Sequence, residues 1–81
     1  MSTRSVGAEL TEFLEQRTNQ PIASDVDLFA GGLLSSLFAL ELVMHLESAF
    51  GIAIGAEDLR LEHFRTVGAM TDLVLRIRAR G

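Results

Sequence analysis

Apolar residues recur every three to four positions in three stretches of this chain, and this spacing predicts three amphipathic helices. The first runs from Val6 to about Arg17, the second from Leu37 to Phe50, and the third follows Thr66, which is expected to cap it. A shorter helix is expected between Gly55 and Leu61, with Leu59 pointing inward. The pattern therefore predicts an all-α fold: a small four-helix bundle of three longer helices and one short one, with a long loop between the first two.

That loop extends from Ile22 to Leu34, a length that needs buried side chains to hold it in place. Its apolar residues are the expected anchors: Ile22, Val26, Leu28, Phe29, Leu33 and Leu34. Asp25 and Asp27 are spaced as in a calcium-binding loop, but the sixth position is Ala30 rather than Gly and the twelfth is Ser36 rather than Glu. No metal site is expected, and the two aspartates are predicted to make loop hydrogen bonds.

The second long helix has two different faces. At about 100° per residue, one side collects an apolar set that should be buried: Ala39, Leu42, Val43, Leu46 and Phe50. The opposite side carries Leu37, Glu41 and Met44, with Phe38 on its flank. These residues either contact other helices or form a surface that docks with a partner protein. Ser35 is predicted to cap this helix, which makes Ser36 its first helical residue, with a hydroxyl left available.

The length, net charge and composition of the chain exclude several classes of protein. Eighty-one residues are enough for one small domain, which we expect to span residues 1–81. The formal net charge of -4 argues against a nucleic-acid partner, and the absence of cysteine excludes disulfides. No apolar run approaches the length of a membrane span, and the N-terminus is polar. We therefore expect a cytoplasmic, free-standing monomer with no membrane partner.

The sequence offers little support for an enzyme. The two histidines are His45 and His63, and His45 lies nine positions from Ser36, on the other side of the helix axis, so a Ser–His dyad is geometrically poor. No glycine-rich phosphate loop and no zinc-ligand spacing is present. The chain is therefore expected to have no catalytic residues of its own.

A set of short motifs, in order along nearly the whole chain, resembles the acyl and peptidyl carrier proteins. These motifs are Asp27-Leu28-Phe29, Gly32-Leu33-Leu34, Ser36-Leu37, Glu41-Leu42-Val43, Leu46-Glu47 and Phe50-Gly51-Ile52. The resemblance implies that Ser36 carries covalent 4'-phosphopantetheine, attached by a phosphopantetheinyl transferase. It also implies that Leu37, Phe38, Glu41 and Met44 are read by enzymes that load, modify or use an acyl thioester. Ser35 departs from the Asp that the family commonly has before the modified serine.

Two further segments, from Ser35 to Ala39 and from Glu62 to Val67, are similar to discrete carriers of secondary metabolism. The resemblance is to carriers that hold unusual polyketide extender units in antibiotic biosynthesis. A free-standing peptidyl carrier that holds an aminoacyl group is the alternative within the family. Outside it, the alternative is an unmodified helical interaction module. Leu61, His63 and Phe64 either line the space that an acyl group enters or pack into the core.

Overall fold

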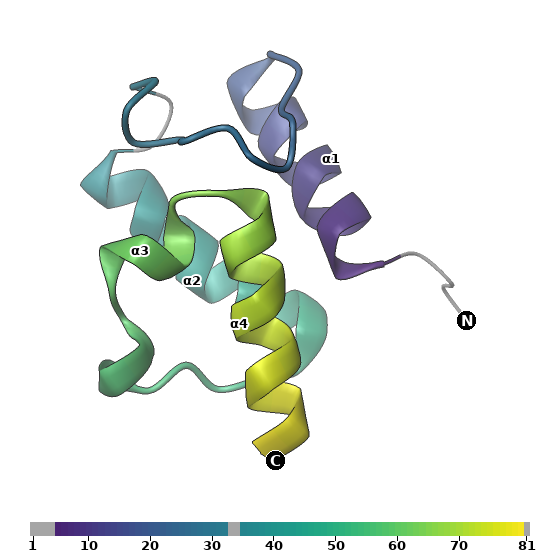
Figure 1. The fold of residues 1–81 in the computed structure, drawn as a ribbon, viewed down its shortest axis with the longest axis vertical. Helices are drawn as coiled ribbons and strands as arrows, with labels where there is room; N and C mark the ends of the chain where they lie inside the picture. The colour runs from purple at the N-terminus through teal and green to yellow at the C-terminus, as the bar shows by residue number, and fades with distance from the viewer. Residues whose placement is uncertain (1–4, 33–34, 81) are drawn as a thin grey trace.

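Four α-helices make up most of the protein, for which a computed structural model describes residues 5–32 and 35–80. They are α1 (Val6–Thr18), α2 (Ser36–Phe50), α3 (Leu61–Phe64) and α4 (Val67–Arg80), and a single 3-10 turn, η1 (Ala56–Asp58), precedes α3 (Figure 1). The described residues contain no strand. The predicted all-α bundle of three longer helices and one short helix is confirmed. None of the helices in these residues is long and apolar enough to cross a membrane.

Local hydrogen bonds set where the long helices begin and end. Ser35 Oγ accepts the backbone N–H of Phe38 at 3.2 Å, and Thr66 Oγ1 accepts that of Ala69 at 3.0 Å, so both predicted caps are confirmed. Gly51 ends α2 in the left-handed region, at φ 64°, where its N–H bonds back to Glu47 O. Ser35 therefore fixes the start of α2 and Gly51 fixes its end, and both residue types are common at these positions of a helix.

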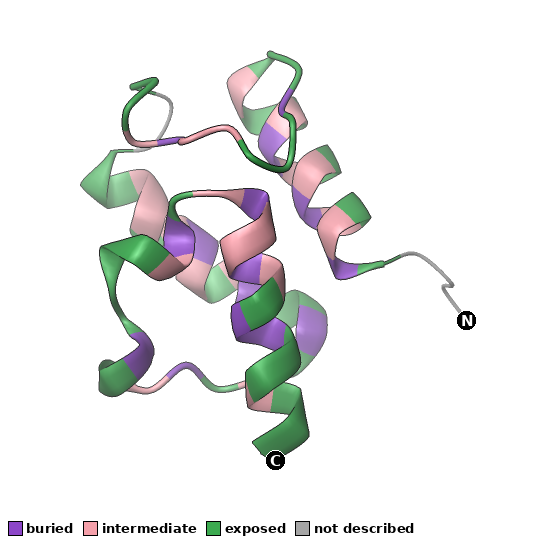
Figure 2. Ribbon diagram, viewed as in Figure 1, coloured by how far each residue is buried: buried purple, intermediate pink, exposed green. Residues whose placement is uncertain are grey.

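The core lies where the inner faces of α1, α2 and α4 meet, and these faces are coloured as buried in Figure 2. Its fully buried side chains are Leu10, Leu14, Leu28, Leu42, Leu46, Val67, Met70, Leu73 and Val74. Within α2, Leu42, Leu46 and Phe50 are buried as predicted, whereas Ala39 and Val43 are only partly buried. Burial of each leucine contributes roughly 1.5–3 kcal/mol of favourable transfer free energy, so this stripe holds α2 in place.

The long loop passes over the helices and is anchored at several points (Figure 1). Ile22 and Leu28 are buried, and Val26 and Phe29 pack against the core, as predicted. The predicted anchors Leu33 and Leu34 lie outside the described residues. The N–H of Leu28 donates to the carbonyl of Arg65 at 2.7 Å, which joins the loop to the segment before α4.

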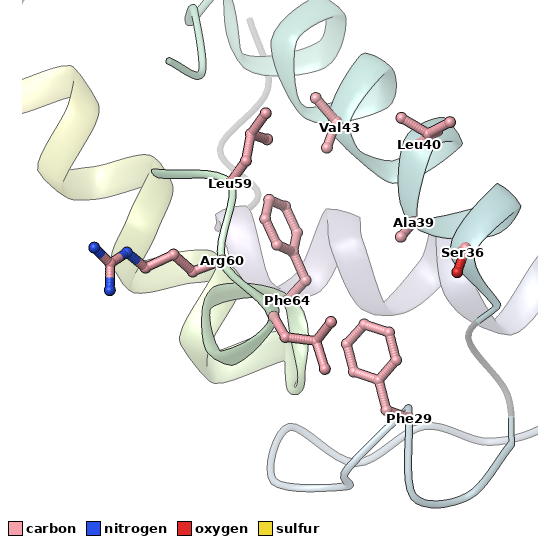
Figure 3. Close-up of a pocket in the computed structure, with 9 residues that line it drawn as sticks. Phe29, Ser36, Ala39, Leu40, Val43, Leu59, Arg60 and Phe64 are labelled. Carbon is pink, nitrogen blue, oxygen red and sulfur yellow. The ribbon is translucent and has the colours of Figure 1, made fainter. Parts of the chain in front are cut away.

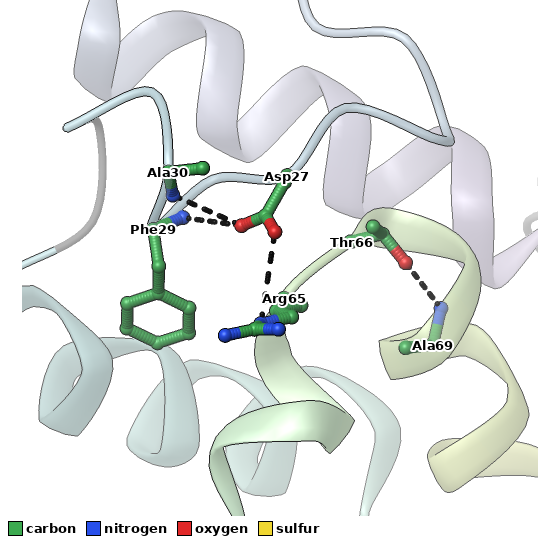
Figure 4. A network of polar contacts seen from close by, with 6 residues as sticks. All are labelled: Asp27, Phe29, Ala30, Arg65, Thr66 and Ala69. Atoms are coloured by element: carbon green, nitrogen blue, oxygen red, sulfur yellow. Dashed lines mark hydrogen bonds and ion pairs between the residues drawn. The ribbon is translucent and has the colours of Figure 1, made fainter.

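Asp27 organises the end of this loop. Its Oδ1 accepts the N–H groups of Phe29 and Ala30 at 3.1 and 3.0 Å, and its Oδ2 lies 3.6 Å from Nε of Arg65 (Figure 4). The predicted loop hydrogen bonds of this aspartate are therefore confirmed. They turn the chain so that the ring of Phe29 points toward α2.

The predicted short helix from Gly55 to Leu61 is wrong in position. Residues Ala56–Asp58 form one 3-10 turn, and the α-helical turn begins only at Leu61. Leu59 lies between them at φ -82° and ψ 70°, with the N–H of Arg60 donating to Asp58 O at 2.9 Å, which is an inverse γ-turn. Leu59 is also 52% exposed rather than pointing inward.

A tertiary contact explains this break in the helix. Asp58 is 7% exposed, and its Oδ2 lies 2.9 Å from Nη2 of Arg80 at the end of α4. Its carbonyl oxygen also lies 2.9 Å from Nδ1 of His63. A buried carboxylate needs a partner of this kind, because its desolvation is costly without one. The position of Asp58 is thus set by α4 rather than by local helix propensity.

Replacing Leu46 by alanine is expected to lower the free energy of unfolding by about 2–5 kcal/mol, because it leaves a cavity in the core. Leu75→Ala is the matched control, since Leu75 is 51% exposed on α4 and its truncation should cost well under 1 kcal/mol. Urea titrations followed by circular dichroism measure both. Equal losses for the two variants would contradict the assignment of Leu46 to the core.

Candidate functional site

Ser36 is the first residue of α2 and is exposed. Its neighbour Ser35 provides the cap and uses its hydroxyl oxygen for the N–H of Phe38. The predicted positions of the two serines in the helix are confirmed: Ser35 caps α2, and Ser36 is its first helical residue. An exposed hydroxyl at a helix N-terminus also lies beside the positive end of the helix dipole, which favours a nearby anion.

Ser36 lies on the rim of a pocket of about 250 Å³ (Figure 3). Leu40 and Val43 of α2 form one wall, and Phe29 of the long loop forms another. The η1–α3 segment closes the third side with Leu59, Leu61 and Phe64. Nearly all of these side chains are apolar, so the pocket favours an uncharged hydrocarbon group over water.

The structure decides between the two alternatives for Leu61, His63 and Phe64 residue by residue. Leu61 and Phe64 line the pocket, and Phe64 is at the same time a buried core residue. His63 instead directs Nδ1 toward the carbonyl of Asp58. No sequence pattern indicated that Phe29, Leu40 and Leu59 line this pocket, because their place depends on how the long loop and the η1–α3 segment fold back onto α2.

The residues predicted to face a partner divide into two groups. Leu37 and Met44 are 71% and 68% exposed, and Leu40, which the sequence analysis did not identify, is 63% exposed. Phe38 is partly buried, and its ring centroid lies 6.3 Å from that of Phe13 on α1. Glu41 forms an ion pair with Arg17. The exposed leucines and Met44 therefore face outward, whereas Phe38 and Glu41 lie along the contact between α1 and α2.

Arg17 stands at the centre of that contact. Its guanidinium carbon is 5.5 Å from the ring centroids of both Phe13 and Phe38, in addition to its pair with Glu41. His45 stacks on the other end of this cluster, with its ring 3.8 Å from that of Phe13 and the two planes 11° apart. Cation–π attraction and stacking both stabilise such an arrangement.

The stacked position of His45 changes its acidity. Burial lowers the pKa of His45 below 6.5, and the nearby cation of Arg17 lowers it further, against the opposing effect of Glu9. The neutral imidazole is therefore the favoured form in the folded protein. His45 lies along the α1–α2 contact rather than in the pocket that Ser36 borders.

One protein family matches this chain: the family described as the phosphopantetheine attachment site aligns with residues 6–74. The chain belongs to that family. Its members are carrier proteins on which partner enzymes act, and they hold 4'-phosphopantetheine covalently. No curated protein matches the chain at a significant level. No group of three or more His, Cys, Asp or Glu side chains within residues 5–32 and 35–80 is arranged to hold a metal ion.

The pocket and its rim fit the prosthetic group of this carrier protein. A phosphodiester needs an exposed hydroxyl, which Ser36 offers, and its anion suits the N-terminus of α2. When attached, the group supplies a flexible arm that ends in a thiol able to form a thioester. Leu40, Val43 and Leu61 provide an apolar surface in the pocket that Ser36 borders.

The carrier protein is expected to lose stability as the pH falls through the lowered pKa of His45. The unfolded chain binds a proton near pH 6.5, whereas the folded chain resists it, so this contribution is fully present above pH 6.5 and disappears on acidification. His45→Phe keeps a ring on Phe13 and should remove this component. Urea unfolding of both proteins at a series of pH values measures it, and parallel profiles would contradict the assignment.

Proposed function

We propose that Ser36 is the attachment residue and that the protein holds an acyl group as a thioester for polyketide or related secondary-metabolite biosynthesis. The observation that supports this proposal most directly is the position of Ser36: exposed, first in α2 and on the rim of an apolar pocket. Ser35 is the competing hydroxyl, but it is occupied as the helix cap.

The proposed attachment reaction uses Ser36 Oγ as its nucleophile. This oxygen forms a bond to the phosphorus that bears the pantetheine arm of coenzyme A, the bond from that phosphorus to the bridging oxygen breaks, adenosine 3',5'-bisphosphate leaves with that oxygen, and the serine proton passes to a base of the transferase. A phosphopantetheinyl transferase supplies the catalysis, since no histidine or carboxylate of the described residues lines the pocket beside Ser36 to act as a general base. The chain itself contributes an accessible nucleophile and a helix N-terminus that stabilises the new anion.

The pocket favours an acyl group over an aminoacyl group. None of the described residues that line it is a carboxylate, and its charged lining residue, Arg60, would repel an ammonium group. A charged amine would lose hydration there without gaining a hydrogen bond. An acyl chain gains by leaving water, and the walls also limit the access of water to the thioester.

Partner enzymes would approach along the outer face of α2. Its exposed apolar residues are Leu37, Leu40 and Met44. Phe38 and Glu41 border them on the side of α1. This face adjoins Ser36, so an enzyme bound there would have its active site within reach of the arm. The similarity of the segments Ser35–Ala39 and Glu62–Val67 to discrete carriers supports a role with polyketide extender units.

Attachment to Ser36 is tested by incubating the apo protein with coenzyme A and a broad-specificity phosphopantetheinyl transferase, followed by intact-mass measurement. One adduct is expected on the wild type and on Ser35→Ala, and none on Ser36→Ala, because only Ser36 supplies the hydroxyl. Circular dichroism verifies that each variant folds. An adduct that persists in Ser36→Ala, or folded wild-type protein that gains none, would overturn the proposal and favour an unmodified interaction module.

A further inference from the structure

One wall of the pocket is formed by Leu59 and Leu61, which lie in the segment between Ile54 and Phe64 (Figure 3). We call residues 55–63, all of which the structure describes, the wall segment. Ile54 and Phe64 are buried, but within the wall segment only Asp58 is buried. Leu59 and Leu61 are both more than half exposed. Burial of apolar side chains therefore holds the two ends of this wall and not its middle.

A polar contact holds the middle of the wall segment. Oδ2 of Asp58 lies 2.9 Å from Nη2 of Arg80, which among the described residues is the one side-chain partner of this carboxylate. The carbonyl oxygen of Asp58 lies 2.9 Å from Nδ1 of His63 and accepts the N–H of Arg60. These contacts join the η1 turn to α3, so a displacement of Asp58 would move the whole wall.

The second aspartate–arginine pair near the pocket is built differently. Asp27 Oδ1 accepts two backbone N–H groups, and its Oδ2 lies 3.6 Å from Nε of Arg65. The Asp27 side chain is 38% exposed, against 10% for Asp58. Without its arginine, Asp27 would keep its backbone donors and its contact with water. Asp58 would be left as an unpaired buried charge, which is far more costly.

We propose, resting on the function proposed above, that Arg80 is a positioning residue: its ion pair with Asp58 holds the wall segment in place beside Ser36. With the pair intact, the wall shields an acyl thioester from water. When the pair is broken, Asp58 lowers its free energy by moving into water. It carries the wall segment outward, because apolar burial holds only the two ends. Closure of the pocket is thus controlled from the last turn of α4, by a side chain that is not among the described lining residues.

Hydrogen exchange of the apo protein, followed by NMR, measures the opening of the wall directly. The N–H groups of Leu59 and His63 are the reporters, because both donate to backbone carbonyls within the segment. Arg80→Gln is expected to speed their exchange about tenfold or more, since it leaves Asp58 unpaired. This exchange should change little with urea below the unfolding transition, because a local opening exposes little surface. A urea dependence as steep as that of Leu46 in the core would overturn the inference.

Charge variants separate this ion pair from other contacts of the wall. Arg80→Lys keeps the cation and should retain most of the wild-type protection. Asp58→Asn combined with Arg80→Gln should exchange more slowly than Arg80→Gln alone, because the amide has no charge to bring into water. Arg65→Gln, the matched change at the Asp27 pair, should alter the reporters less than about twofold. Equal exchange in Arg80→Gln and Arg65→Gln, or no rescue in the double variant, would overturn the inference.

Asp58→Asn provides the test if circular dichroism shows that Arg80→Gln does not fold. This substitution removes the ion pair without leaving a buried charge, so its reporters should exchange faster than those of Arg65→Gln. Exchange no faster than in Arg65→Gln would contradict a role for the pair.

The consequence for the cargo is measured on protein loaded from hexanoyl coenzyme A by a broad-specificity phosphopantetheinyl transferase. Hydrolysis of the thioester is expected to be about threefold or more faster in Arg80→Gln than in the wild type, since an open wall admits water. Equal rates would overturn the shielding role of the wall. Wild-type protein that is not loaded on Ser36 would overturn the proposed function, and exchange in the apo protein would still decide whether Arg80 holds the wall.

Discussion

The rotational position of α2 about its own axis is the constraint on which the rest of this structure depends. Leu42 and Leu46 have no exposed surface, so the core fixes which side of α2 faces inward. Ser35 and Gly51 fix where the helix starts and stops. With the inward face and both ends fixed, the step of 100° per residue sets the direction of every other side chain: Ser36 lies on the rim of the pocket, and Leu37, Leu40 and Met44 face outward. A helix that began one residue later would leave Ser36 outside the helix.

The pocket depends on contacts far from α2, because α2 supplies only one wall. The loop wall is held by Asp27, which bonds to its own backbone and reaches Arg65. The other wall is held by Asp58, which is paired with Arg80 at the far end of α4. A carboxylate thus ties the loop wall to the segment before α4 and the other wall to α4 itself, so polar contacts outside the pocket present the two apolar surfaces to α2.

The features that were predicted correctly depend on interactions between residues close in sequence, whereas the missed ones depend on residues far apart in sequence. The long helices, their caps and the buried stripe of α2 depend on neighbours within a few residues, so the sequence predicted them. The short helix was misplaced because Asp58 is positioned by Arg80, 22 residues away. The contact of Arg17 with Phe38 and Glu41 joins α1 to α2 across the long loop, and no local pattern indicates it. Of the candidate site, the sequence predicted Ser36 and part of one wall.

Net charge and local charge have separate consequences for a carrier of this kind. The chain has a formal charge of -4, and such a field attracts cationic surfaces over distances of about a Debye length, roughly 10 Å in 0.1 M salt. At contact, the side chains that touch the partner matter more than the net charge of the chain. Beside the exposed Leu37, Leu40 and Met44 these are the carboxylate of Glu47, the Arg17–Glu41 ion pair and His45, whose pKa is lowered mainly by burial. Under the proposed function, long-range attraction brings a partner close, and the fit of the apolar side chains next to Ser36 then governs which bound orientation is productive.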